Sequence, residues 1–205
     1  MTRERKPAAN RREQIVRATI RSLARDGGAG LSTHKVAREI GVRQGLIHHY
    51  FKSKHALLLA ALEATIADVN RRLADAEGQG GDARGQLRTL ISALVGLDQE
   101  VRLILLRFSS SSRVDRDLRR IVAAFYHDLR NAFVKVLQRG QQRHIFRLAK
   151  PEDAADAARV IVAVVEGMAL QSIVDPGAIS QEDVTRLGIE AVTAWLEKPL
   201  RRRGR

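Results

Sequence analysis

Hydrophobic positions recur at helical spacing along most of the chain, and no segment shows sustained alternation of period two. The first such segment covers about residues 11–25, and its inward side is formed by Ile15, Ala18, Thr19, Ser22 and Leu23. Further helices are predicted at about residues 53–76, 83–96, 98–109, 115–139, 151–173 and 180–195. The pattern therefore predicts an all-α protein.

Residues 31–54 predict two short helices joined by a tight turn. Val36 and Ile40 give the first helix a narrow apolar stripe, and Gly41 is suited to end it in a left-handed conformation. A second helix is predicted at about residues 44–51. A helix of this size fits the major groove of DNA, so the pair is a candidate helix-turn-helix.

The polar side of the second helix is the candidate DNA-reading surface. Ser32 or Thr33 is expected to cap the first helix, and Ser53 the helix that follows, which places Lys54 beside amide dipoles that favour a phosphate. Tyr50 belongs partly to the core in an alternative interpretation. The expected DNA-binding residues are Ser32, Thr33, His34, Arg43, Gln44, Gly45, Leu46, His48, His49, Tyr50 and Lys54.

The charge distribution supports a polyanionic partner. The chain carries a net charge of +13, and residues 1–57 hold 13 Lys and Arg against 4 Asp and Glu. Residues 198–205 add 5 basic residues, whereas residues 58–197 hold 18 basic against 19 acidic residues. A protein with an evenly basic surface would carry its surplus of Lys and Arg along the whole chain. The surplus here lies in residues 1–57 and 198–205, which favours a nucleic-acid partner.

Several segments break the helical pattern. Residues 77–82 are the clearest break and predict a flexible connector, and residues 109–112 predict a polar one. Gly140 is placed where a helix could end, and Pro151 where the next could open. The helix at about residues 53–76 would act as a lever between the parts on either side of it.

From about Arg12 to Leu58 the chain resembles the N-terminal domain of the TetR family of one-component bacterial transcriptional regulators. The residues that carry the resemblance are Ile15, Ala18, Leu23, Gly27, Leu31 to Thr33, Val36, Ala37, Gly41, Val42, Gly45, His49 to Phe51, Ser53, Lys54 and Ala56 to Leu58. The family pattern implies that His49 and Tyr50 contact the DNA backbone. Arg43, His48 and Gly28 differ from the family pattern. Because Arg43 and His48 are expected on the DNA-facing side, the operator sequence is expected to differ as well.

Over roughly residues 85–197 the chain resembles the TetR subgroup typified by the choline-sensing repressor of betaine synthesis, through the segment 151–176 with Gly140 and Phe146. The resemblance implies that the last two helices of each subunit form a four-helix dimer interface, behind helices that enclose an effector pocket. The alternative is a monomer core. The expected interface residues are Ala158, Ile161, Val165, Gly167, Ile189, Val192 and Trp195.

Charged and aromatic side chains in the second half are candidates for an effector pocket. Arg107 and Glu166 lie in apolar surroundings, so each needs a partner, either a charged effector or the other residue. Aromatic side chains can bind a cation, although core packing is the favoured role for each of them. The candidate aromatic residues are Phe108, Phe125, Tyr126 and Phe133.

Other classes of function lack the residues they need. The chain has no cysteine and no grouping typical of a catalytic site, so it is not expected to be an enzyme or to hold a cofactor. No carboxylate is regularly spaced with His34, His48, His49 or His55, so no metal site is expected. The longest apolar runs, residues 160–165 and 103–106, predict no membrane partner.

The sequence thus predicts a flexible basic arm (1–10), a three-helix DNA-binding domain (11–57), a helical-bundle effector-binding and dimerisation domain (58–197) and a basic tail (198–205). The expected function is that of a cytoplasmic bacterial regulator, a homodimeric repressor that leaves its palindromic double-stranded operator when a small-molecule effector binds. It would be nucleoid-associated when bound to DNA. The alternative is an architectural or non-specific DNA-binding protein without an effector.

Overall fold

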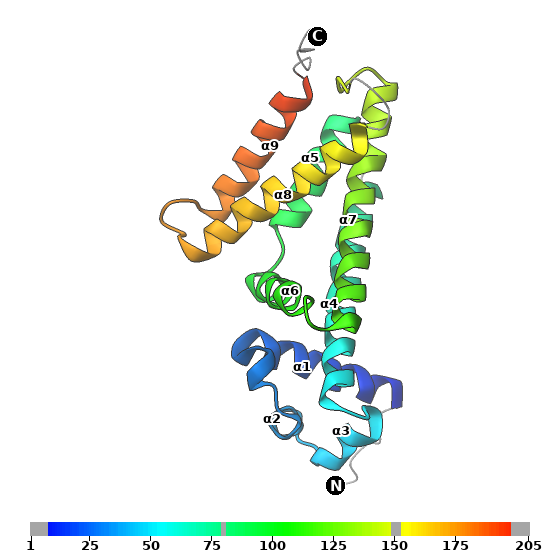
Figure 1. Cartoon of the computed structure of the whole chain (residues 1–205), viewed down its shortest axis with the longest axis vertical. Coiled ribbons are helices and arrows are strands. Elements are labelled where there is room, and N and C mark those ends of the chain that lie inside the picture. Colours follow the sequence, from blue (N-terminus) through cyan, green and yellow to red (C-terminus); the bar gives the residue numbers. More distant parts are fainter. Residues whose placement is uncertain (1–7, 79–80, 149–152, 198–205) are drawn as a thin grey trace. The chain divides into compact units, whose positions relative to one another are not determined.

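The computed structural model describes residues 8–78, 81–148 and 153–197, and within these ranges it holds nine helices and no strand (Figure 1). The helices are α1 (Ala8–Gly30), α2 (Thr33–Glu39), α3 (Gln44–Tyr50), α4 (Lys54–Gly78), α5 (Ala83–Val95), α6 (Gln99–Ser111), α7 (Arg116–Gln142), α8 (Asp153–Val174) and α9 (Gln181–Glu197). The predicted all-α fold class is therefore confirmed.

Most predicted helices match the observed ones within a few residues, and two differences have local causes. The predicted connector at residues 109–112 is largely helical, since α6 continues to Ser111, and the hydroxyls of Ser110 and Ser112 donate to the carbonyls of Arg107 and Ser109 at 2.9 and 2.7 Å. Gly140 lies inside α7 instead of ending a helix, so that prediction is wrong.

The expected breaks at the start and middle of the chain are only partly described. Helix α1 begins at Ala8, so the last three residues of the expected flexible arm are helical, and α4 continues to Gly78 in the expected connector. Gly27 interrupts α1 with a φ of 73°, two residues after the predicted end of the first helix at about residue 25. Residues 1–7, 79–80, 149–152 and 198–205 lie outside the described residues.

The contacts divide the chain into two compact units. Unit 1 contains α1 to α3, α4 up to Asp68, residues 98–124 with α6, and the start of α7; unit 2 contains the rest. Helix α6 belongs to unit 1 because it packs on α1 (Figure 1). The division is therefore not linear in the sequence, whereas the sequence predicts a boundary after residue 57.

Each unit has its own apolar core. In unit 1 the predicted inward side of α1 is buried, and Ile15, Ala18, Thr19 and Ser22 are all 0 % exposed. In unit 2, α8 packs on both α5 and α9, and α9 also packs on α5 (Figure 1). The largest fully buried side chains of unit 2 are Leu87, Leu90, Ile91, Leu129, Phe133 and Leu137.

Helix α8 is more apolar than the short run at residues 160–165 indicates. Over an 18-residue window its mean hydropathy is 1.7, so by length and composition alone it is the one described helix that could cross a membrane. However, one side of α8 packs on α5 and α9 through small and β-branched side chains such as Ala158, Ile161 and Val165. Only this side is buried, since 33 % of the window is buried within the described residues.

Gly140 provides a sharp test of packing in unit 2. A Cβ at this position would overlap the buried ring of Phe146 and lie 3.0 Å from the Cβ of Ala83. We expect Gly140→Ala to lower the free energy of unfolding by about 1–3 kcal/mol, measured by urea denaturation at fixed protein concentration.

Gly188→Ala is the matched control for this test. Its added Cβ would meet Ile91 Cγ2 and Val165 Cγ2 at 3.7 and 3.8 Å, which is ordinary van der Waals contact. Because alanine favours a helix over glycine by about 1 kcal/mol, this variant should be as stable as the original or more so. Equal losses in both variants would contradict the role of Phe146.

Candidate nucleic-acid interface

The turn between α2 and α3 is closed by backbone hydrogen bonds. Gly41 N–H donates to Arg38 O at 3.2 Å, and Val42 N–H donates to Ala37 O at 2.9 Å. Gly41 has a φ of 67°, the left-handed conformation predicted for the end of the first helix. The turn therefore brings α3 directly after α2, as a helix-turn-helix requires.

Two apolar side chains set the orientation of α3. Ile47 is 0 % exposed and Phe51, at its C-cap, is 4 % exposed, in a core that also contains Val36. The guanidinium of Arg12 lies over the Phe51 ring, with Cζ 5.1 Å from the centroid. With this side of α3 buried, its opposite side faces solvent.

The predicted DNA-binding residues divide into two groups by exposure. Exposed residues are His34, Arg43, Gln44, Gly45, His48, His49 and Lys54, and half-buried residues are Ser32, Thr33, Leu46 and Tyr50. Tyr50 meets the His49 ring edge to face, with centroids 5.3 Å apart, so its partial core role is consistent with its burial. The exposed polar side chains lie on α3 and at the starts of α2 and α4.

Gln44 connects the two short helices. Its Nε2 donates to Thr33 Oγ1 at 2.8 Å and lies 3.5 Å from His48 Nε2. The amide thus sits between the start of α2 and the middle of α3, and these contacts hold the Gln44 side chain in place. Glutamine can form two hydrogen bonds to an adenine edge, so its position here suits base recognition.

Of the two predicted helix caps, one is present and one is absent. Ser53 Oγ accepts the Ala56 N–H at 3.0 Å and caps α4, which confirms that prediction. Ser32 has the extended backbone of an N-cap, but its side chain makes no cap hydrogen bond to α2. The prediction that a hydroxyl caps α2 is therefore wrong, because Thr33 Oγ1 instead accepts from Gln44.

Acidic side chains near the two helices have basic partners within unit 1. Arg21 Nε donates to Glu39 at 2.7 Å, and Lys35 Nζ lies 3.4 Å from Asp26. Desolvation opposes ionisation of Asp26, but hydrogen bonds and charge from Arg25 and Lys35 outweigh it and lower its pKa.

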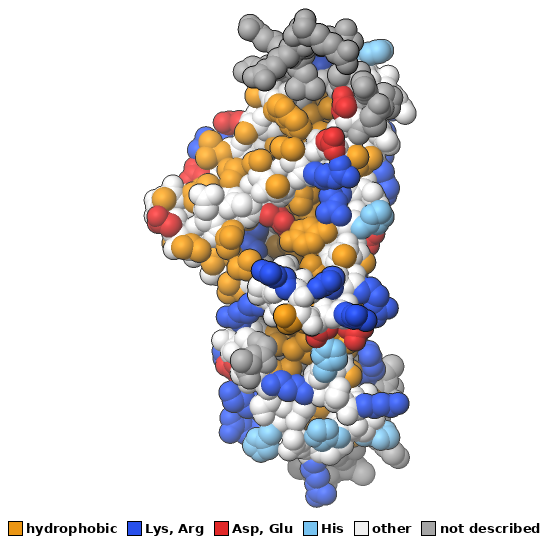
Figure 2. All heavy atoms as spheres, viewed as in Figure 1, with side chains coloured by type: hydrophobic (Ala, Val, Ile, Leu, Met, Phe, Trp, Pro, Cys, Tyr) orange, Lys and Arg blue, Asp and Glu red, His pale blue; other side chains and the backbone are white. Residues whose placement is uncertain are grey.

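Basic and histidine side chains dominate this end of the chain in Figure 2. Arg43, Lys52 and Lys54 have no ion pair with any carboxylate of the described residues. The surface of α2, α3 and the start of α4 is therefore positive and open to an anion.

Arg107 is held within unit 1. Its Nη1 donates to the carbonyls of Leu23 at 2.8 Å and Ala24 at 3.3 Å. These carbonyls belong to the last turn of α1 before the break at Gly27, where a helix leaves acceptors unpaired. Arg107 therefore links α6 to the end of this part of α1.

A cavity of about 480 Å³ lies beside Arg107 in unit 1. It is lined by Leu23, Asp26, Gly27, Leu58, Ile104, Arg107, Phe108, Ser110, Ser111 and Leu118. Of the six predicted effector residues, only Arg107 and Phe108 belong to it. The other lining residues were not predicted as pocket residues; Gly27 lies just after the predicted first helix, and Ser110 and Ser111 lie in a predicted connector.

The remaining effector candidates belong to unit 2, so neither unit by itself contains the predicted set. Phe125 and Phe133 are buried, at 2 % and 0 % exposed, and Tyr126 and Glu166 are half-buried. The rings of Phe125 and Tyr126 are tilted, with centroids 5.3 Å apart. Burial of both phenylalanines matches the core-packing alternative.

The expected dimer residues need correction. Ala158, Ile161, Val165 and Val192 are at most 4 % exposed within the single chain, because they face α5 and the neighbouring helix of the same unit. Gly167 and Ile189 are half-buried, and Trp195 is 36 % exposed. These two helices also carry exposed apolar side chains, which are Val160, Val164, Leu170, Val174 and Leu187.

Two family models match the chain. Residues 15–61 match the model of bacterial regulatory proteins of the tetR family, and residues 83–197 match the model of the BetI-type transcriptional repressor, C-terminal. The first covers α2 and α3 with their flanking helices, and the second covers α5 to α9. Together they span both the candidate interface and most of unit 2.

Relatives match over nearly the whole length. The HTH-type transcriptional regulator BetI of Vibrio vulnificus is 30 % identical over 205 residues, covering 93 % of this chain and 92 % of the relative. A putative transcriptional regulator from Pseudomonas aeruginosa PAO1 is 27 % identical, covers 94 % and 93 % of the two chains and has a TM-score of 0.77.

A putative regulator from Saccharomonospora viridis, solved in complex with choline, has the same fold, with 21 % identity, coverage of 90 % and 96 %, and a TM-score of 0.83. The exposed helix-turn-helix, the two matching family models and the near full-length BetI relative lead to one assignment. The chain belongs to the TetR family of bacterial transcriptional regulators, with a BetI-type C-terminal domain.

Proposed function

We propose that this regulator is a homodimeric repressor that binds a palindromic operator and is released by a small-molecule effector. The observation that carries the proposal is the exposed polar side of α3, held outward by the burial of Ile47 and Phe51. Two copies of α3 in one dimer would occupy successive major grooves about 34–36 Å apart. As a DNA-bound regulator it would act in the cytoplasm, on the nucleoid.

The residues of the interface have two roles in this proposal. Arg43, Gln44 and His48 lie on the exposed side of α3, where their side chains would meet base edges. Lys54 follows the cap at Ser53, so its ammonium group and the α4 amide groups would bind a phosphate. The hydroxyl of Ser32 has no cap hydrogen bond and would also bind the backbone.

Dimerisation would use the outer sides of α8 and α9. Val160, Val164 and Leu170 on α8 are 45, 38 and 39 % exposed, and Leu187 and Trp195 on α9 are 37 and 36 % exposed. Figure 2 shows hydrophobic side chains gathered over these helices. An exposed apolar surface of this kind is typical of an interface between subunits.

Effector release would follow from a two-state equilibrium. An effector that binds better to the arrangement with mis-spaced α3 helices lowers operator affinity, typically by about 1–3 kcal/mol of coupling. Helix α4 would carry the change, because it begins at the Lys54 contact and continues without a break to Gly78. Since one structural neighbour holds choline, an organic cation of that kind is the first compound to test.

The basic surplus of residues 1–57 also favours a second candidate, an architectural protein that binds any DNA. Footprinting separates the two. We expect wild-type protein to protect one discrete palindrome selected from random DNA, and choline or a related effector to abolish this protection. Even protection of all sequences would favour the architectural protein.

Lys54→Ala and Gln44→Ala should affect DNA binding differently. Loss of Lys54 should weaken binding to every sequence and lower the slope of log K against log salt by about 0.9 for each phosphate that the variant no longer neutralises. Loss of Gln44 should cost about 1–3 kcal/mol on the selected palindrome and little on random DNA. Fluorescence anisotropy at several salt concentrations measures both, and equal losses on all sequences would contradict the two roles.

Val164→Glu tests the dimer surface, because a charge on the outer side of α8 would be buried against the partner. We expect a monomer by light scattering, and loss of operator binding. Val114→Glu is the control, since Val114 is 91 % exposed and lies in unit 1. This control should remain a dimer, and a dimeric Val164→Glu protein would exclude the proposed interface.

A further inference from the structure

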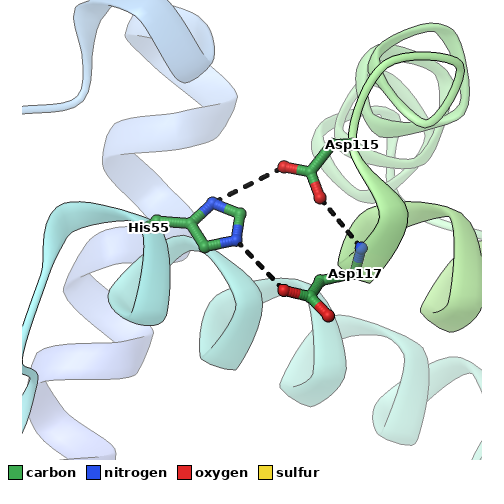
Figure 3. A group of neighbouring side chains, drawn as sticks. All are labelled: His55, Asp115 and Asp117. Atoms are coloured by element: carbon green, nitrogen blue, oxygen red, sulfur yellow. Dashed lines mark hydrogen bonds and ion pairs between the residues drawn. The ribbon is translucent and has the colours of Figure 1, made fainter.

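Three possible metal ligands that are distant in the sequence meet in unit 1 (Figure 3). His55 lies in the first turn of α4, Asp115 directly precedes α7, and Asp117 lies in its first turn. His55 Nδ1 is 3.6 Å from Asp115 Oδ2, and His55 Nε2 is 3.7 Å from Asp117 Oδ2. One ligand atom from each residue lies within 4.8 Å of the others.

The helix start holds one of the carboxylates in place. Asp115 Oδ1 accepts the N–H groups of Asp117 at 3.0 Å and Leu118 at 3.1 Å, which leaves Oδ2 on the side of His55. The His55 side chain is 46 % exposed. Rotation about Cβ–Cγ, a torsion with a broad energy minimum, would bring either nitrogen between the two carboxylates.

The two carboxylates have no lysine or arginine partner among the described residues of a strongly basic chain. Although the net charge is +13, no Lys or Arg of the described residues lies within 4.0 Å of the oxygens of Asp115 or Asp117. Arg119, in the next turn of α7, instead donates to the carbonyls of Ser112 and Arg113. With a neutral imidazole the cluster carries two negative charges, so it favours a bound cation.

We propose that His55, Asp115 and Asp117 bind a divalent transition-metal ion such as Zn²⁺. Imidazole nitrogen and carboxylate oxygen are ligands that such ions prefer, at about 2.0–2.2 Å. Only one ring nitrogen of His55 can bind a given ion, and one ligand atom from each of the three residues lies within 4.8 Å of the others. At these bond lengths two ligand atoms of one ion lie at most about 4.4 Å apart, so rotation of the side chains must bring the three atoms slightly closer. Water would complete the coordination, because the site is open to solvent.

A bound ion would join the first turn of α4 to the first turn of α7. Lys54 precedes His55 directly, so the ion would fix the part of unit 1 from which the proposed phosphate contact is made. Metal binding itself does not depend on the proposed regulatory function. It can be measured on the full chain without DNA or effector.

The rival explanation is a proton. A protonated imidazole can donate one N–H to each carboxylate, and this would account for both contacts without a metal. Because the ring nitrogens point away from each other, only one of them can bind a given ion. The metal explanation requires that an ion binds with measurable affinity through these three residues. The proton explanation does not require any metal binding.

Titration of the chelator-treated full-length protein with Zn²⁺ alone tests the proposal. Calorimetry should detect one ion per chain, and at a hundredfold excess of Zn²⁺ over its Kd the melting temperature should rise by about 5 °C or more. His55→Gln and Asp117→Asn should each weaken binding more than about tenfold. Both variants keep the Asp115 cap of α7, and circular dichroism checks that they are folded.

His127→Gln is the matched control, because His127 is an exposed histidine on α7 whose ring contacts Asn131. It should bind Zn²⁺ as the original protein does. Absence of Zn²⁺ binding would overturn the proposal in favour of the proton. Unchanged binding by His55→Gln and Asp117→Asn would overturn it by placing the ion elsewhere.

Discussion

Burial of Ile47 and Phe51 in the core of unit 1 is the constraint on which the candidate DNA-reading surface depends. In a helix of two turns, fixing these two positions leaves no freedom to rotate about the helix axis. Arg43, Gln44 and His48 are therefore held on the opposite side, in solvent.

Hydrogen bonds and ion pairs around this core keep the surface positive. Glu39 and Asp26 are paired with basic side chains of α1 and α2, so their charges are locally balanced. Arg107 connects α6 to the last turn of α1 through two carbonyls. A displacement of α6 would disturb those bonds, and unit 1 thus contains a physical link between α6 and the helix that supports α2.

Helix α8 combines two apolar surfaces. Ile161 and Val165 face the core of unit 2, whereas Val160 and Val164 are on the surface. A helix that is hydrophobic all round must bury its second side against something, either lipid or another protein surface. Its packing on α5 and α9, together with the neighbouring exposed residues of α9, favours a second subunit.

Local sequence patterns determined the helices, the turn at Gly41 and the outward side of α3, because each depends on residues close in the chain. The cap of α4 by Ser53 is local too. Tertiary structure decided what depends on distant residues: Phe146 against Gly140, Arg107 on the end of α1, and the side of α8 left exposed. Helical periodicity does not indicate which apolar side faces the core, so such pairings cannot be found from spacing alone.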